Sequence, residues 1–463
     1  MSASLSRRRR IAAGIGGLTA LLLAMPSTVL AHQLTERYAA PLPLIVYVAG
    51  AGLAVAMSFV FVMLRDVTPT TEGRPEPAPA RTVPAWTRGL LQAIGLLGWL
   101  WIVVQTMVGG AGGDGDVASL FLWVYGWVGV ALVSALIGPA WTWIDPFSTL
   151  HRLVAWIGAR LGLSGGEPAH YPKRLGRWPA AVAFVALVWI ELVGRIDGGR
   201  SLGLLMIAYT LLTLAGMSFF GRETWRRNVE VFSVWFMLLG RLAPFALVGE
   251  PEAGRVRRRP FGAGLLSGGW STDQLAIIAL ATGAIIYDGL SQTQIYFDLF
   301  GGINLLGPPV LRNTIIASVF LGGLVGIVLA VARRLNTAAV CAGLLPVAVG
   351  YMLAHYFNYL LVEGQRIIAA INDPLIRGDN LLPIDLGFYE PKPFLPAAVL
   401  WSIQLAAVVG GHVVGAWAGH RALAKGGVPT EPVRQLPLAA LMVTLTSVTL
   451  WSLGQVLFIP TDV

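Results

Sequence analysis

Three ionisable residues lie inside apolar stretches of the sequence, and their side chains could take part in acid–base catalysis or bind a metal ion. Asp288 occurs in IIYDGL, His355 in LAHYFNYL and Glu191 in VWIELVG. A charged group in such a stretch is costly to bury in a membrane and is by default a functional-site candidate. An imidazole beside a carboxylate can transfer protons, or it can bind a divalent metal ion that makes a bound water acidic.

Helical spacing extends this set of candidates. His355, Asn358 and Tyr359 fall on one face of a helix, and Glu363 follows two turns later on the same side. We therefore predict a catalytic acid–base or metal site formed by Asp288 and His355, with Glu363 as a further catalytic candidate. The alternative is that these side chains only hydrogen-bond one helix to another.

Two other histidines are candidate metal ligands, together with Asp288 and His355. His32 would become the first residue if a signal peptide were removed after Ala31, and its amine and imidazole would then chelate an ion such as Cu(II). His412 lies among glycines in VVGGHVVGAW, where a packed, hydrogen-bonded histidine is the alternative to an ion path from His355. A divalent metal ion of open identity is thus the expected cofactor.

The composition indicates that these residues are held by helices in a membrane. Of the 463 residues 56% are hydrophobic and 12% are charged, and the mean hydropathy is +0.69. A soluble protein has about 25% charged residues, and runs of about 20 apolar residues recur along this chain. A transmembrane barrel would instead show alternating segments of about 10 residues. We predict an all-α fold, a polytopic transmembrane helical bundle in contact with the lipid bilayer.

The basic residues favour membrane topology over a nucleic-acid partner. The net charge is +9, but Arg and Lys lie in short loops between the apolar runs. That distribution is the positive-inside pattern, so we expect no nucleic acid. The single cysteine, Cys341, excludes a disulfide within the chain and a cysteine-based metal site.

Residues 1–31 have the basic start, short apolar core and small residues of a cleavable signal peptide, and residues 32–463 are predicted to form a single helical membrane domain. About ten spans are expected, at 44–64, 89–108, 118–139, 178–194, 201–219, 272–290, 310–332, 338–361, 395–418 and 436–458. Most basic residues fall in loops 65–88, 140–177, 220–271, 333–337 and 419–435. This predicts a multi-pass protein of the inner cell membrane with both termini outside the cytoplasm. Asp288, His355 and His32 would then lie at one depth near the outer surface.

Three segments on the predicted inner face are not ordinary loops. Residues 67–85 are Pro-rich and are predicted to be a flexible linker. Residues 140–163 and 229–248 are apolar but interrupted by charge, which is typical of interfacial or re-entrant helices. The alternative for 229–248 is a full span, which would invert the topology of everything that follows.

Several common catalytic motifs are absent from the sequence. It has no phosphate-binding Gly-Lys-Ser loop, no GxSxG elbow, no HExxH and no pair of cysteines. An ATPase, an ordinary serine hydrolase, a zincin and a thiol enzyme are therefore all disfavoured.

A series of short motifs spread over nearly the whole chain resembles a family of bacterial integral membrane proteins commonly labelled fenitrothion hydrolase. The motifs are Ala31-His32, Gly138-Pro139, Asp145-Pro146-Phe147, Phe220-Gly221-Arg222, Glu230-Val231-Phe232-Ser233-Val234, Arg241-Leu242-Ala243-Pro244, Asp288-Gly289, Ala354-His355-Tyr356-Phe357, Glu363-Gly364-Gln365, Asp373-Pro374 and Gly411-His412-Val413. The resemblance implies hydrolysis of a phosphotriester or related organophosphorus ester outside the cytoplasm. It brings no catalytic residues of its own.

These observations together predict a membrane-embedded, metal-assisted hydrolase whose site lies in the outer leaflet and takes a small lipophilic ester. One alternative is a permease or other membrane protein that handles a metal ion, with His32, His355 and His412 serving capture and passage. The other is a non-catalytic membrane subunit that needs a partner chain for activity.

Overall fold

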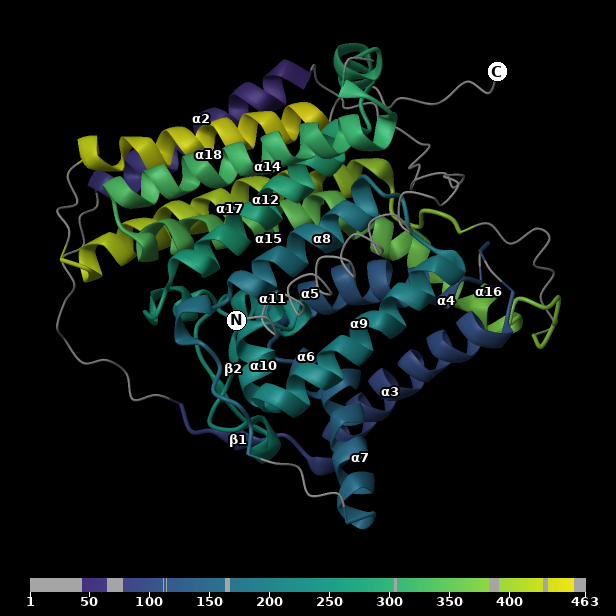
Figure 1. Ribbon diagram of the computed structural model, residues 1–463. Coiled ribbons are helices and arrows are strands. Elements are labelled where there is room, and N and C mark those ends of the chain that lie inside the picture. The colour runs from purple at the N-terminus through teal and green to yellow at the C-terminus, as the bar shows by residue number, and fades with distance from the viewer. Residues whose placement is uncertain are drawn as a thin grey trace, which may run out of the picture.

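The computed structural model describes residues 44–64, 78–110, 112–113, 115–162, 167–303, 306–382, 391–427 and 432–453. The predicted signal peptide and His32 lie outside this part of the chain, as do residues 65–77 of the expected linker region. Within it, long helices dominate and run roughly alongside one another (Figure 1). This confirms the all-α, polytopic helical bundle.

Nine helices of the described residues are long and apolar enough to cross a bilayer. They are α2 (Leu44–Leu64), α3 (Ala85–Val108), the continuous α4–η1–α5 (Val117–Ser119, Leu120–Val130, Ala131–Leu136), α9 (Gly199–Phe220), α12 (Thr272–Ser291), α14 (Pro309–Arg334), α15 with η7 and α16 (Thr337–Glu363, Gly364–Arg366, Ile367–Asn372), α17 (Ala397–Lys425) and α18 (Pro432–Leu453). The protein is therefore a multi-pass membrane protein.

The fourth expected span, 178–194, is shorter than predicted. Helix α8 (Trp178–Leu192) has 15 residues, whereas a span needs about 20. It ends because Gly194 is followed by Arg195, whose φ of 49° is left-handed and cannot continue a helix. The polar turn Asp197-Gly198 then leads into α9.

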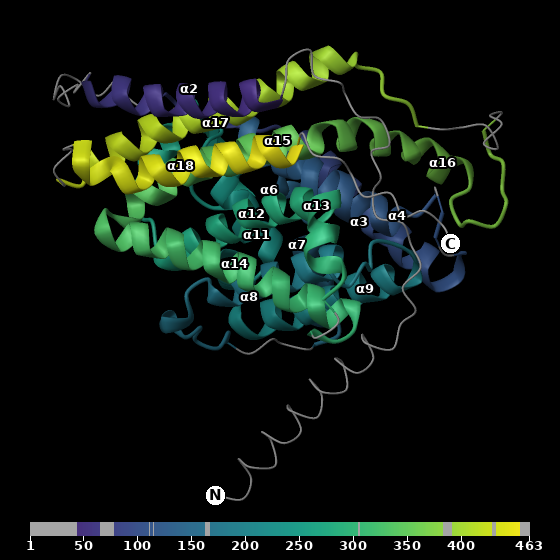
Figure 2. The same cartoon turned by 90° about the horizontal axis from the view of Figure 1, so that it is seen from above.

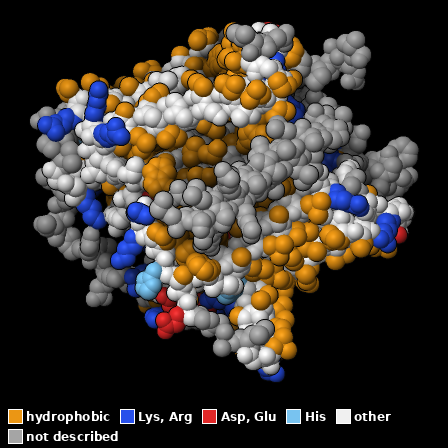
Figure 3. Space-filling model, viewed as in Figure 1, with side chains coloured by type: hydrophobic (Ala, Val, Ile, Leu, Met, Phe, Trp, Pro, Cys, Tyr) orange, Lys and Arg blue, Asp and Glu red, His pale blue; other side chains and the backbone are white. Residues whose placement is uncertain are grey.

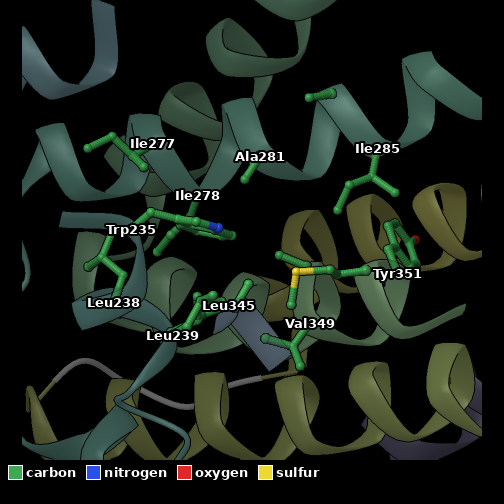
Figure 4. Close-up of a cluster of buried hydrophobic side chains, with 14 of the residues drawn as sticks. Trp235, Leu238, Leu239, Ile277, Ile278, Ala281, Ile285, Leu345, Val349 and Tyr351 are labelled. Atoms are coloured by element: carbon green, nitrogen blue, oxygen red, sulfur yellow. The ribbon is translucent and has the colours of Figure 1, made fainter. Parts of the chain in front are cut away.

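Helices α12 and α15 form the centre of the bundle, and nearly all of α12 is buried. Their apolar side chains meet those of a short helix, α11 (Val231–Leu239), as Trp235, Ile278 and Leu345 show in Figure 4. Helix α15 also packs along α17. Helices α2 and α18 pack against each other and both contact α17, and α18 also contacts α12 and α15 (Figure 2).

The outer helices present apolar side chains to the surroundings. Leu53 of α2, Leu97 of α3 and Val319 of α14 are each about two-thirds exposed, and apolar atoms cover much of the face seen in Figure 3. In a soluble protein so large an apolar surface would be unfavourable. In this protein it is the surface that contacts lipid.

One end of the bundle carries a small sheet that the sequence did not predict. Strands β1 (Arg81–Thr82), β2 (Phe245–Leu247) and β3 (Arg255–Arg258) are antiparallel in the order β1-β3-β2, with Arg81 opposite Val256 and Phe245 opposite Arg258. Strands of two to four residues are too short to show an alternating pattern. Part of the expected linker 67–85 therefore contributes a strand and the start of α3.

The two segments expected to be interfacial or re-entrant differ from each other. In 140–163 the chain forms two helices, α6 (Trp141–Ile144) and α7 (Pro146–Arg160), neither of which has the length of a span, and α7 exposes Val154 and Trp156. In 229–248, α11 follows α10 (Arg222–Asn228) and is almost wholly buried. Its nine residues are too few to cross the bilayer, so the full-span alternative is wrong. The chain turns at Gly240 and returns as β2.

The remaining short elements lie between these helices. They are η2 (Lys173–Leu175), η3 (Pro251–Ala253), η4 (Ala263–Leu266), α13 (Gln294–Tyr296) and η5 (Phe297–Gly301). Helices α12 and α15 are separated in sequence by the single span α14, so they run in the same direction across the bundle. Their C-terminal halves consequently lie at the same end, where the candidate side chains are found.

Candidate functional site

Asp288 and His355, the two principal candidates, are in direct contact. His355 Nε2 lies 2.9 Å from Asp288 Oδ2, and the Asp288 side chain is buried. The hydroxyl of Tyr356 donates a hydrogen bond of 2.8 Å to the same oxygen. Gln292 Nε2 donates one of 2.7 Å to Asp288 Oδ1. Both oxygens of the carboxylate are therefore held by neighbouring side chains.

Two helices position these groups. Asp288 and Gln292 are four residues apart at the end of α12, so they lie on one face. His355 and Tyr356 are adjacent on α15, with their rings 4.6 Å apart at an angle of 87°. Gly289 of α12 lies beside the imidazole, since a Cβ there would be in ordinary van der Waals contact with His355 Cε1, at 3.5 Å. The imidazole is thus held between two rigid helices.

The two nitrogens of His355 have different surroundings. Nε2 faces the carboxylate, whereas Nδ1 makes no hydrogen bond within the part of the chain that the structure describes. The His355 side chain is 18% exposed. One nitrogen is therefore oriented by a carboxylate and the other is available to a water or a substrate.

A cavity of about 80 Å³ adjoins this pair. It is lined by residues of α8, of the turn that follows α8, of α12 and of α15: Glu191, Leu192, Arg195, Asp197, Asp288, Ser291, Gln292, His355, Tyr356 and Tyr359. The volume is enough for a few water molecules. Glu191, the third ionisable residue of the apolar stretches, shares the cavity with the Asp288–His355 pair.

The sequence did not single out Asp197, Arg195 or Tyr356 as site residues. Asp197 and Arg195 reach the cavity because α8 stops short and the chain turns back beside α12. The signal for this was the sequence GRIDGG directly after the apolar run, since glycine-rich polar clusters mark turns. The role of Tyr356 depends on the rotation of α15 against α12, which sequence spacing does not give.

Glu363 is not brought into the cavity. It lies two turns beyond His355, as expected, but its carboxylate pairs with Arg366 in the next turn. Side chains three residues apart meet readily on a helix. The structure therefore gives Glu363 an ion pair with its own segment and no contact with Asp288 or His355.

His412 is a packed histidine. It is fully buried on α17, with Nδ1 2.8 Å from the carbonyl oxygen of Val408 and Nε2 3.2 Å from the hydroxyl of Tyr351. Both ring nitrogens have partners, and neither belongs to the Asp288 cavity. The structure thus matches the hydrogen-bonded alternative for His412, whereas His32 lies outside the described residues.

The donor set around Asp288 does not fit a metal ion in this arrangement. Among the described residues no group of three or more His, Cys, Asp and Glu side chains is placed to hold one. The Asp288 oxygens and His355 Nε2 face one another and their hydrogen-bond partners, whereas a catalytic zinc site needs three protein ligands and an open position. The expected divalent ion stays a prediction.

No protein-family model, no curated protein and no solved structure matches this chain. The function is consequently argued from the geometry of the site.

Proposed function

We propose that the chain is a membrane-embedded hydrolase in which His355 activates water as a general base. The observation that carries this proposal is the arrangement of the imidazole: Nε2 is on Asp288, Nδ1 is unbonded by any described residue, and His355 lines a water-sized cavity. A carboxylate that accepts a hydrogen bond from one ring N–H fixes the tautomer and stabilises the imidazolium that forms. Such positioned proton transfer accelerates reactions by about 10²–10⁴-fold.

The substrate we propose is a small lipophilic ester of the organophosphorus type, in keeping with the resemblance of the chain to fenitrothion-hydrolase-like proteins. Water in the cavity forms the bond to phosphorus while its proton passes to His355 Nδ1. The bond from phosphorus to the leaving oxygen breaks, and that oxygen departs as an alkoxide or phenoxide or takes the proton from the imidazolium. A lipophilic ester concentrates in the bilayer, next to the site.

We place this site in the outer half of the inner membrane, with both termini outside the cytoplasm, an orientation that counts the short α8 as a tenth crossing. The support is the distribution of basic residues, most of which lie in the loops at the opposite end of the bundle from Asp288. The hydrolysis assay described below also tests the two other components. Loss of activity with a chelator would indicate a divalent ion, and activity of the isolated chain would show that no partner membrane chain is needed.

The test uses purified protein in lipid nanodiscs and a chromogenic phosphotriester. We expect turnover by the wild type and a loss of about 10²-fold or more in His355→Ala. His420→Asn is the matched control, because His420 is also buried but bonds Gln435 outside this cavity. Equal rates for wild type and His355→Ala, with all three proteins folded, would show that His355 is not the base.

A second function is favoured by the small size of the cavity. Ligand pockets usually have volumes of about 300–1,000 Å³, whereas this cavity of about 80 Å³ gathers Glu191, Asp197, Asp288 and His355. Carboxylates and histidines inside a membrane are typical of proton and ion paths. A permease that couples to protons or a metal ion is therefore the alternative. Proteoliposomes that take up a metal ion with proton movement, without hydrolysing the ester, would favour it.

A further inference from the structure

A second and larger cavity lies at the opposite end of the bundle, beside the small sheet. Its volume is about 350 Å³, which is within the usual range for ligand pockets. It is enclosed by α6, α10, α11 and β2. The Asp288 cavity shares no lining residue with it, so any ligand bound in it would be distinct from the substrate proposed above.

The lining carries an excess of positive charge. Arg226, Arg227, Arg241 and Arg259 border the cavity, and Glu223 is the only acidic residue among the described lining residues. Arg226 Nη1 and Arg227 Nε both bond to Glu223, at 3.1 and 2.6 Å, and Arg226 Nε also lies 3.2 Å from Oδ2 of the buried Asp145, which is not a lining residue. The other two arginines make no ion pair with a described residue. Many Lys and Arg side chains visible in Figure 3 lie toward this end of the bundle.

Arg241 and Arg259 are held in place without being neutralised. Arg259 Nε donates to the carbonyl oxygen of Ala243 at 3.0 Å, and its Nη2 donates to that of Gly240 at 2.6 Å. Arg241 Nη1 donates to the carbonyl oxygen of Gly268 at 2.8 Å, and its guanidinium lies 3.8 Å from the centre of the Trp270 ring. Because both groups are partly buried, burial lowers the pKa of each guanidinium. A bound anion would relieve that cost.

Ser134 provides an independent indication of a ligand. Its side chain is 1% exposed and lines the cavity, yet its hydroxyl has no hydrogen-bond partner in the described structure. A buried hydroxyl without a partner costs about 1–3 kcal/mol, so such groups are normally satisfied by protein, water or ligand. The hydroxyl would be satisfied by an acceptor oxygen in the cavity.

We propose that this cavity binds the phosphoryl group of an anionic ligand, either a phospholipid headgroup or a soluble phosphate compound. Arginine forks match the oxygens of phosphate in pairs, and the Ser134 hydroxyl can donate to another oxygen. The remaining walls include Trp141, Phe236, Met237 and Leu247. These suit the glycerol and upper acyl carbons of a lipid, which makes the headgroup the favoured source.

Native mass spectrometry of the full chain, released from nanodiscs containing a neutral and an anionic phospholipid, tests this proposal. We expect the anionic lipid to be retained, and its retention to fall roughly tenfold in Arg259→Gln, because a hydrogen bond to a charged group is lost. Arg227→Gln is the second variant, since Arg227 is half exposed and less important for folding. Arg255→Gln is the matched control, because Arg255 is exposed on β3 and does not line the cavity.

Inorganic phosphate added to protein in neutral lipid distinguishes the two sources. Stabilisation against thermal unfolding by phosphate, weakened in Arg227→Gln and Arg259→Gln but not in Arg255→Gln, would support the phosphoryl site with a soluble ligand. Selective lipid retention with the same pattern would support the headgroup. If folded Arg227→Gln and wild type bind both probes equally, or if wild type binds neither, the proposal is overturned.

Discussion

At the scale of single residues, Asp288 organises the candidate site. Its two oxygens meet His355, Tyr356 and Gln292, all at 2.7–2.9 Å. Hydrogen bonds to an ionised group are stronger than neutral ones, and the low dielectric of the interior strengthens them further. The same environment makes the site sensitive, because a change at Asp288 leaves buried donors without an acceptor.

The first prediction concerns Asp288→Asn. The amide of the substituted side chain has nearly the shape of the carboxylate, but it is uncharged and its NH₂ group cannot accept a hydrogen bond from His355, Tyr356 or Gln292. It therefore no longer stabilises the imidazolium. We expect ester hydrolysis to fall by about 10²-fold or more. Tyr356→Phe removes one donor and leaves the contact with His355, so its loss should be roughly tenfold. A loss in Tyr356→Phe that exceeds the loss in Asp288→Asn would show that Asp288 is not the group that supports the imidazolium.

The second prediction concerns Asp373, which follows α16. Burial raises the pKa of its carboxyl, but hydrogen bonds from the backbone N–H groups of Arg377 and Gly378 outweigh burial and lower it. Because the folded-state pKa is lowered, the stabilisation is present above the unfolded pKa of about 3.9 and is lost as the pH falls through the folded value.

We therefore expect the turn 373–378 to be more protected from hydrogen exchange in wild type than in Asp373→Ala at neutral pH. The two proteins should converge only when the pH falls below the lowered folded-state pKa of Asp373, where the carboxyl is protonated. The ratio of their exchange rates at each pH is the measurement, since it cancels the intrinsic pH dependence of exchange. A ratio that stays constant with pH would show that ionisation of Asp373 does not hold the turn.

At the scale of elements, close contact between α15 and α17 keeps His355 in place. A Cβ at Gly411 would lie 2.6 Å from the carbonyl oxygen of Pro346, and one at Gly415 would lie 2.3 Å from that of Gly343. Only glycine permits backbones to approach so closely, and small residues are typical of helix interfaces in membranes. Gly410, the residue directly before Gly411, has no atom within 4 Å of its Cβ position.

The third prediction uses this difference. Gly411→Ala should destabilise the protein by about 1–3 kcal/mol through overpacking, and it should lower activity because α15 carries His355. Gly410→Ala is the matched control and should be neutral or slightly stabilising. Thermal unfolding in one detergent, monitored by circular dichroism, gives the comparison. Equal melting temperatures would mean that the backbones of α15 and α17 are not in close contact at Gly411.

Most of the long helices could be predicted from the sequence, because a run of about 20 apolar residues is the length that a membrane-spanning helix requires. The short strands and the nine-residue α11 could not, since their length is set by the packing around them rather than by periodicity. Within the site, the pairing of Asp288 with His355 followed from the equal depth that the predicted topology gave them. The ion pair of Glu363 with Arg366 could not be predicted, because it depends on the side-chain rotamers of both residues. The position of Asp197 in the cavity could not be predicted either, because it depends on the turn after α8.

At the scale of the whole molecule, the protein is a bundle with a carboxylate–histidine site at one end and a basic cavity at the other. The basic loops predict that the second end faces the cytoplasm. The chain is well suited to a direct test, because its single cysteine, Cys341, is buried. Background labelling by a thiol reagent should therefore be low.

The fourth prediction is that Lys392→Cys reacts with a membrane-impermeant maleimide in intact spheroplasts and that Arg255→Cys reacts only after lysis. Both positions are exposed, at opposite ends of the bundle in the predicted topology. The mass added to each variant is the measurement. The reverse pattern would overturn the orientation while leaving the helical fold untouched.

The shortness of α8 has a further consequence for the surrounding lipid. Its 15 residues extend for about 22 Å, against a hydrocarbon thickness of about 30 Å, and its Val182 is exposed. A stretch this much shorter than the bilayer makes the membrane thin locally to match it. Headgroups and water would dip toward Glu191, so a molecule dissolved in the acyl chains would travel a shorter way to reach an aqueous reaction centre.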